Sequence, residues 1–401
     1  MKKTSNLDNK FYNKIKMKIV EYDKSFEIMN LKFSKLIDKI DELINSKLFE
    51  SQYFKEPILR KQEHLTINYN NTDDLFMSKI FKLLADEQFS FWPNNNSFDS
   101  QKMIRIFEKI LNEKFQNENR FFIKFFFNLR NNNYLNYKFN IFVDEFIFFL
   151  SNLYNSNEVV TKIFERIEIA KMHKKNLCTF ANDPFFKKRN LYLFYVFNYF
   201  NNKVKNNLNN FSLNQENILS FQQNVIINMI NTFKYIENIN FIDFFENLFE
   251  NDFYNIIPID YHIPRSLYLL GFFDLFPKLN KLFEENQNTI FNERDLRILE
   301  LRKISHLILN LIIYKLLEKY NSEYLSFYAQ TYFAFNKKNQ SYISEFLYTF
   351  ISYNIQVDSY LFYFSKFDKN LNNERSAFNL FELYKKDYEN ISYLKVDTIN
   401  F

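Results

Sequence analysis

The amino-acid sequence predicts an all-α protein, mostly helical with few or no strands, and three observations support this. Its 401 residues include one Gly and 6 Pro, so the Asn-Gly and Gly-X turns that connect hairpin strands are almost absent. Hydrophobic residues make up 47% of the chain, which is enough for a sizeable core in one large or two closely packed domains. Near the N-terminus, apolar side chains recur at helical spacing. They are Phe11, Ile15, Ile19, Phe26, Leu31, Phe33, Leu36 and Ile40.

Three segments are expected along the chain. Residues 1–55 form a helical extension whose polar face mixes Lys with Asp and Glu, which favours packing over membrane binding. Residues 56–330 hold the central domain, with an Asn-rich insertion at about 201–240. Residues 331–401 are expected to form a C-terminal helical cap followed by a polar tail.

Charge and cysteine usage limit the expected partners. The net charge of +5, from 52 basic and 47 acidic residues, is too small and dispersed to indicate direct nucleic-acid binding. The longest apolar runs, 139–150 and 307–314, fall short of the ~20 residues that a membrane span needs, so no membrane contact is expected. The single Cys178 cannot form an intramolecular disulfide, and no secretion leader is recognisable, which predicts a cytoplasmic location.

Several common chemistries are excluded by scarce residue types. A chain with one glycine has no glycine-rich phosphate loop, which excludes P-loop NTPases, Rossmann dinucleotide sites and kinases. The four histidines show neither an HExxH arrangement nor pairing with cysteines, so neither a metal nor another cofactor is expected. Cys178 lacks the glycine-flanked elbow of a nucleophile and is interpreted as a core residue.

The run from Asp260 to Gly271 has the features of a loop that delivers a carboxylate to the start of a helix. Pro264 suits the first helical position, where its missing N–H costs nothing. Gly271 then ends the helix about two turns later, or permits close packing. Asp260 is expected beside the positive end of the helix, where a carboxylate is stabilised as the anion.

This run, Asp-Tyr-His-Ile-Pro-Arg at residues 260–265, resembles the Asp-Tyr-Arg-x-Pro-Gln segment of the queuosine-salvage family. Those enzymes hydrolyse queuosine 5'-monophosphate to queuine and ribose 5-phosphate. Further family motifs have counterparts in order along the chain. They are His64, Phe89-Ser90-Phe91-Trp92-Pro93 with the chain's only Trp, Phe185-Phe186-Lys187-Lys188, Leu270-Gly271 and Glu300-Leu301-Arg302.

The resemblance implies an N-glycosidase, a hydrolase of queuine salvage for tRNA modification, with a compact helical domain similar to the helical DNA glycosylases. Its small-molecule substrate is queuosine 5'-monophosphate. Asp260 is the expected catalytic residue, because an oxocarbenium-like ribose cation needs an anion beneath it and a base to activate water.

The resemblance also implies a set of substrate-binding residues. Aromatic side chains supply a flat slot for the nucleobase, and a basic residue holds the 5'-phosphate. Positions 300 and 302 point to different sides of one helix, so only one of them faces the pocket, and Glu300 is favoured. The expected substrate-binding residues are Phe91, Trp92, Tyr261, Glu300, Arg302, Lys187 and His64.

Departures from the family pattern leave a second hypothesis open. His262 and Arg265 replace the family's arginine and glutamine, Tyr195 stands where an aspartate is expected, and Ala85 aligns with the aspartate that opens the tryptophan motif. The alternative is therefore a catalytically degenerate helical scaffold that binds a nucleotide or a protein. Asp260 also has a simpler interpretation, as a helix cap.

Overall fold

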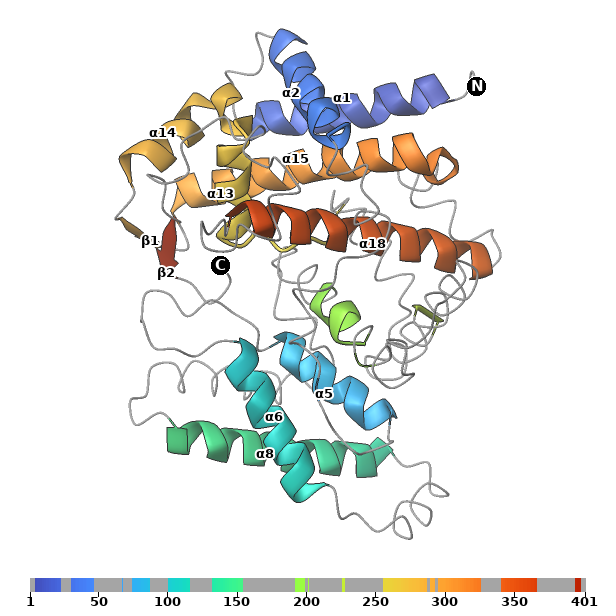
Figure 1. The fold of residues 1–401 in the computed structure, drawn as a ribbon, viewed down its shortest axis with the longest axis vertical. Coiled ribbons are helices and arrows are strands. Elements are labelled where there is room, and N and C mark those ends of the chain that lie inside the picture. Colours follow the sequence, from blue (N-terminus) through green and yellow to red (C-terminus); the bar gives the residue numbers. More distant parts are fainter. Residues whose placement is uncertain are drawn as a thin grey trace, which may run out of the picture. The chain divides into compact units, whose positions relative to one another are not determined.

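The computed structural model describes part of the chain (Figure 1). The described residues are 4–22, 30–46, 67, 74–86, 100–115, 132–153, 192–198, 201, 226–227, 255–286, 289–292, 295–325, 340–365 and 394–397. These residues are predominantly helical, which confirms the all-α prediction. The finer expectation, a likeness to the helical DNA glycosylases, stays a prediction.

The chain divides into two compact units. Among the described residues, unit 1 contains those up to residue 46 and those from 255 onward, and unit 2 contains those from 67 to 227. Most of the Asn-rich stretch 201–240 lies outside the described residues. The three segments expected from the sequence stay a prediction.

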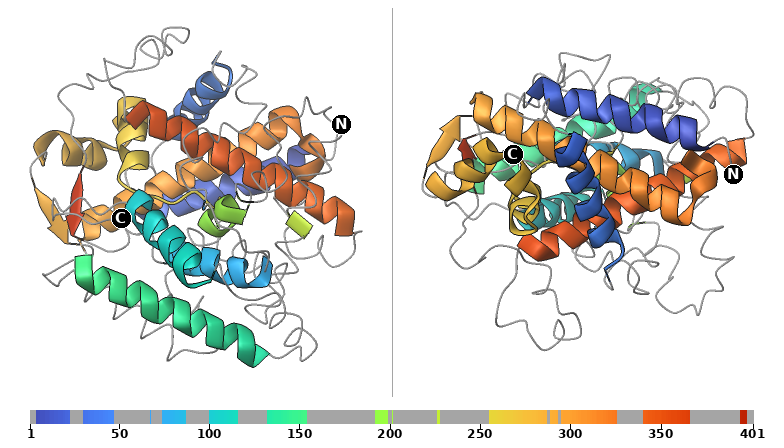
Figure 2. Two further views of the ribbon diagram at one scale, coloured as in Figure 1. Left: turned by 60° about the horizontal axis from the view of Figure 1, so that its bottom comes forward. Right: turned by 90° about the horizontal axis from the view of Figure 1, so that it is seen from above.

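Unit 1 is built around one long helix, α15, which runs from Leu296 to Tyr320. Apolar side chains occupy nearly its whole circumference, as expected of a helix packed on all sides. Within this unit α15 lies between α1 and α18 (Figure 1; Figure 2, right). The other elements of unit 1 are α1 (Thr4–Tyr22), α2 (Asn30–Ile44), α13 (His262–Leu269), η5 (Phe272–Leu275), α14 (Pro277–Glu285), η6 (Ser322–Tyr324) and α18 (Gln340–Ser365).

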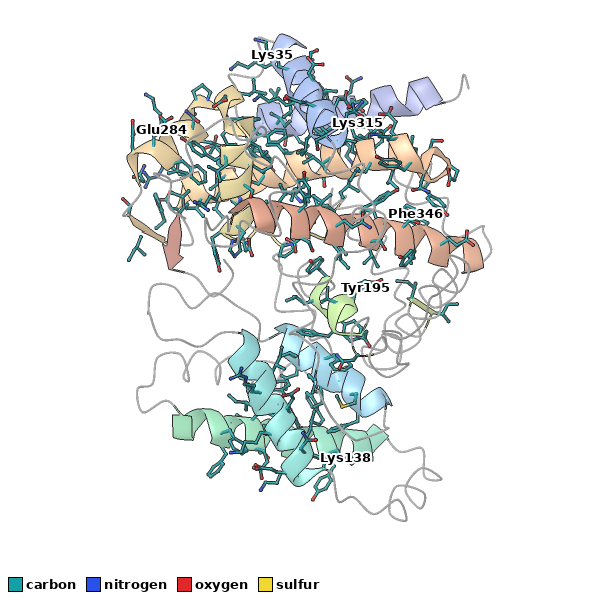
Figure 3. The ribbon with its side chains drawn as sticks, viewed as in Figure 1. Lys35, Lys138, Tyr195, Glu284, Lys315 and Phe346 are labelled. Carbon is teal, nitrogen blue, oxygen red and sulfur yellow. The ribbon has the colours of Figure 1, made fainter. Side chains whose placement is uncertain are left out.

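Helices α1 and α2 both pack against α15 in this core. The ring of Phe11 stacks on that of Tyr314 of α15, with centroids 4.2 Å apart and planes 9° from parallel. Lys315 of α15 reaches Asp41 of α2 at 3.3 Å and Glu318 at 3.0 Å (Figure 3). The N-terminal helices therefore cover a face of α15 that would otherwise meet water.

The C-terminal part of the chain contributes both a core helix and a strand. Helix α18 packs against α13 and α15, and the ring of Phe346 lies 5.8 Å from that of Tyr324 of η6 (Figure 3). Strand β2 (Lys395–Asp397) pairs in parallel with β1 (Ile290–Asn292). These are the strands within the described residues, in agreement with the expected scarcity of strands.

Unit 2 contains α5 (Asp74–Asp86), α6 (Ser100–Lys114) and α8 (Asn132–Leu153). Its core is aromatic, because Phe107 of α6 meets Phe142 and Phe146 of α8 edge to face at 5.0 and 4.8 Å. The aliphatic stem and ammonium of Lys138 are buried here, with Nζ 5.2 Å from the centre of the Phe76 ring (Figure 3). No helix within the described segments combines the length and apolar character needed to cross a bilayer.

Candidate functional site

The N-terminus of α13 presents Asp260, as the sequence predicted. Asp260 Oδ1 accepts hydrogen bonds from the backbone N–H of His262 at 2.9 Å and of Ile263 at 3.4 Å. These are two of the N–H groups that a helix leaves without intrahelical partners, so the carboxylate caps the helix and lies at its positive end.

The predicted position of Pro264 in this helix is wrong by two residues. The helix begins at His262, and Tyr261 already has helical angles, with φ −65° and ψ −19°. Asp260 rather than the proline therefore sets where the helix begins. Pro264 is still tolerated in the first turn because the N–H that it lacks has no acceptor within the helix.

The predicted end of the helix at Gly271 is confirmed. The backbone N–H of Leu270 donates to Ser266 O at 3.0 Å, and that of Gly271 donates to Tyr268 O at 2.8 Å. Gly271 then adopts left-handed angles, φ 73° and ψ 17°, which a residue without a Cβ reaches at low cost. It leads directly into η5, so the glycine supports the turn that follows α13.

The side chains next to Asp260 are aromatic and closely packed. The rings of Tyr261 and His262 lie 4.0 Å apart with planes tilted by 41°. His262 is 5% exposed, whereas Asp260 and Tyr261 are half-buried. A buried imidazole at this position agrees with a structural role for His262.

The motif Glu300-Leu301-Arg302 lies in the first turns of α15, as expected of the head of a helix. Asp295 caps this helix: its Oδ1 accepts from Arg297 N at 2.9 Å, and the guanidinium donates to both carboxylate oxygens at 3.0 and 2.7 Å. These hydrogen bonds from the Arg297 side chain and backbone hold the pKa of Asp295 below its usual range. The start of α15 is thereby fixed.

Residues 300 and 302 point in nearly opposite directions, because each residue advances about 100° around a helix. Glu300 is one turn from Lys303, whose Nζ lies 4.6 Å from the centre of the Tyr22 ring on α1. Arg302 is one turn from His306, which contacts the segment leading to Asp260. Arg302 is also 8% exposed, whereas Glu300 is half-buried. This geometry favours Arg302 over Glu300 as the residue on the Asp260 side.

The segment before Asp260 is held by four buried polar residues, Asn255, His306, Asn310 and Asn354, which we call the amide clamp. Asn255 Nδ2 lies 3.1 Å from His306 O, 2.5 Å from Asn310 Oδ1 and 3.0 Å from His306 Nδ1. The backbone N–H of Ile256 donates to Asn354 Oδ1 at 2.7 Å. No local sequence pattern marks this cluster, because its partners are 51 to 98 positions apart.

The structure does not describe the remaining predicted site residues. His64, Phe91, Trp92 and Lys187 lie outside the described residues. Tyr195 is described and is 1% exposed (Figure 3). Among the residues that the structure describes, no three His, Cys, Asp or Glu side chains gather to hold a metal ion.

The arrangement at α13 can do one piece of chemistry well: it holds a carboxylate anion, oriented by backbone N–H groups, at a fixed place beside an aromatic ring. Such an anion stabilises a developing positive charge and accepts a proton from water.

Comparison of the chain with protein-family models, with curated proteins and with solved structures finds no match.

Proposed function

We propose that this protein hydrolyses the N-glycosidic bond of queuosine 5'-monophosphate and releases queuine. The observation that carries the proposal is the position of Asp260 at the start of α13, within the run that resembles the family's Asp-Tyr segment. The ribose becomes cationic at C1' as the bond breaks, and an anion held beneath it lowers the barrier.

Capping and catalysis are compatible at Asp260. Both backbone hydrogen bonds reach Oδ1, and a carboxylate has further acceptor sites on its second oxygen. The cap fixes the orientation of the group before substrate arrives, which lowers the cost of organising it during the reaction. In this proposal Asp260 also activates the attacking water.

The other roles follow from the chemistry of the substrate. A flat deazapurine base stacks on aromatic rings, a role proposed for Tyr261, Phe91 and Trp92, with His64 nearby. The 5'-phosphate needs a cation, and Arg302 or Lys187 supplies it, since an arginine binds phosphate bidentately. Glu300 is retained only as a weaker candidate because it lies on the side of α1.

A second function, nucleotide binding without turnover, is favoured by one specific observation. Tyr195 is buried where the family has an aspartate, so one carboxylate of the expected pair is missing from that position. If hydrolysis needs both carboxylates, this protein binds the nucleotide and leaves the bond intact.

The experiment is direct. The full chain is incubated with queuosine 5'-monophosphate, and free queuine is measured by chromatography, with guanosine 5'-monophosphate as the control substrate. We expect queuine release and no guanine release. Binding of queuosine 5'-monophosphate without queuine would select the second function, and the absence of both would reject the two proposals together.

A further inference from the structure

The amide clamp fixes two consecutive residues from both flanking helices. The side chain of Asn255 binds α15, and the backbone N–H of the next residue, Ile256, binds Asn354 of α18. The three asparagine side chains of the clamp are fully buried, and His306 is 5% exposed. Burying these amides costs desolvation free energy, because the donor and the acceptor of each amide must then find partners within the protein.

The orientation of each amide is determined by a backbone carbonyl, which can only accept. His306 O faces Asn255 at 3.1 Å, so the atom turned toward it is the amide nitrogen. The same nitrogen also lies 3.0 Å from Nδ1 of the buried His306 imidazole. Likewise Phe350 O accepts from Asn354 Nδ2 at 2.7 Å, which turns Asn354 Oδ1 toward the N–H of Ile256.

The few residues between Ile256 and Asp260 form a short and rigid segment, so fixing Ile256 also restricts the position of Asp260. Ile257 and Ile259 are buried, and Pro258 between them has a fixed φ. A displacement at Ile256 is therefore passed on to Asp260, where a misplacement of about 1 Å lowers a reaction rate about 100-fold.

We propose that Asn255 and Asn354 are positioning residues for Asp260, which hold its backbone segment between α15 and α18 and so fix the carboxylate beneath the reacting sugar. This inference rests on the proposed glycosidase function. In this proposal both residues act through the peptide groups that precede Asp260.

Unit 2 supplies a matched control, because it contains the same bonding pattern at an unrelated place. Asn201 Oδ1 accepts from the backbone N–H of Ile67 at 3.2 Å, and Asn201 Nδ2 donates to Phe197 O at 2.8 Å. Like Asn354, it bonds a backbone carbonyl four residues back and one distant backbone N–H. Asn201→Ala therefore removes the same two kinds of hydrogen bond within unit 2.

The first measurement is hydrogen exchange of the full-length chain. Asn354→Ala leaves the buried N–H of Ile256 without its acceptor, so peptides covering residues 255–263 should exchange faster by tenfold or more, a change of about 1.4 kcal/mol in local opening. Asn201→Ala should leave those peptides unchanged. Unchanged exchange in Asn354→Ala would overturn the clamp.

The second measurement separates positioning from a merely structural role. In Asn354→Ala, kcat for queuine release should fall about 10- to 100-fold while KM changes less than about twofold, since an interaction made through the catalytic group is lost and not a substrate contact. A rise in KM with kcat unchanged, or no change in either, would overturn the positioning role.

Asn354→Asp tests the hydrogen-bond geometry itself. A protonated carboxyl has the same shape as the amide, donates to Phe350 O and accepts from Ile256, whereas its anion repels that carbonyl. Burial, with Asp358 one turn away on α18, raises the pKa of the introduced acid, so the protonated form persists above the usual pH range. The kcat of this variant relative to wild type should recover as the pH falls, and a ratio independent of pH would contradict the proposal.

The outcomes separate the two proposals. A wild-type protein that releases no queuine overturns the glycosidase function, and the positioning role falls with it. An active wild type whose Asn354→Ala variant keeps its kcat overturns the positioning role alone.

Discussion

Arg302 and Lys303 are neighbouring cations of α15 with different surroundings, and a pair of substitutions distinguishes them. Arg302 is buried and lies one turn from His306, which contacts Asn255, whereas Lys303 lies over the Tyr22 ring on α1. If Arg302 holds the 5'-phosphate, Arg302→Met should raise KM for queuosine 5'-monophosphate at least about tenfold, because a charge-assisted hydrogen bond contributes about 1.5–3 kcal/mol.

The control substitution is Lys303→Met, which should leave KM unchanged. The nucleoside queuosine, which has no phosphate, should be affected little by either substitution in initial-rate measurements. Equal effects of Arg302→Met on nucleotide and nucleoside would show that Arg302 has a structural role.

Asp295 stabilises the start of α15 both as a cap and as the ion partner of Arg297. Asp295→Ala should lower the free energy of unfolding by about 1 kcal/mol, the usual cost of losing an N-cap. Asp295→Asn retains a capping oxygen and should cost less, since an exposed ion pair contributes little to stability. Urea denaturation of the three proteins measures both effects.

Because the pKa of Asp295 is lowered, the stability difference between wild type and Asp295→Asn depends on pH. A carboxyl group with a lowered folded-state pKa stabilises the fold above its unfolded pKa of about 3.9, and this contribution is lost as the pH falls through the folded value. The difference between wild type and Asp295→Asn should therefore narrow below about pH 4. A difference that stays constant to pH 2 would contradict the assignment.

At the scale of elements, α1 is held in place by its buried face. One side chain on each face of α1 tests this. Phe11 is buried and stacked on Tyr314, whereas Met17 is 67% exposed. Phe11→Ala should destabilise unit 1 by about 3–5 kcal/mol in denaturant titrations, the range for removing a buried aromatic ring. Met17→Ala should stay within about 0.5 kcal/mol of wild type, and equal costs for the two would refute the packing of α1 on α15.

The short helix α13 depends on the left-handed conformation of Gly271. Gly271→Ala adds a Cβ at φ 73°, which costs about 1–2 kcal/mol for an L-residue in that region. The variant should therefore unfold at lower denaturant, and hydrogen exchange should place the loosening in residues 262–275. An unchanged midpoint would mean that the turn after α13 takes another conformation in solution.

At the scale of the whole molecule, the helical class was predictable because a chain with one glycine has little turn chemistry for sheets. The cap at Asp260 and the turn at Gly271 were also predictable, since both depend on local residue types. The predicted start of α13 was wrong because Pro264 was expected at the first helical position, whereas the helix begins at His262, directly after the capping Asp260 and Tyr261.

What the sequence could not reveal depends on contacts between distant segments. The amide clamp joins residues of three separate segments, and a buried asparagine looks like any other in a chain rich in Asn. The β1–β2 pair is formed by strands of 3 residues each, too short for an alternating pattern to mark them. The sequence favoured Glu300 over Arg302, because choosing between them correctly requires knowing which element covers each side of α15.

The proposed role of Asp260 is tested most directly by Asp260→Asn. Asparagine caps a helix as well as aspartate does, so the variant should keep its free energy of unfolding within about 0.5 kcal/mol, while the anion beneath the sugar is lost. We predict a fall in kcat for queuine release of at least about 100-fold, as when one group that stabilises transition-state charge is removed. An Asp260→Asn protein that releases queuine at the wild-type rate would show that Asp260 only caps α13, and would contradict the proposed mechanism.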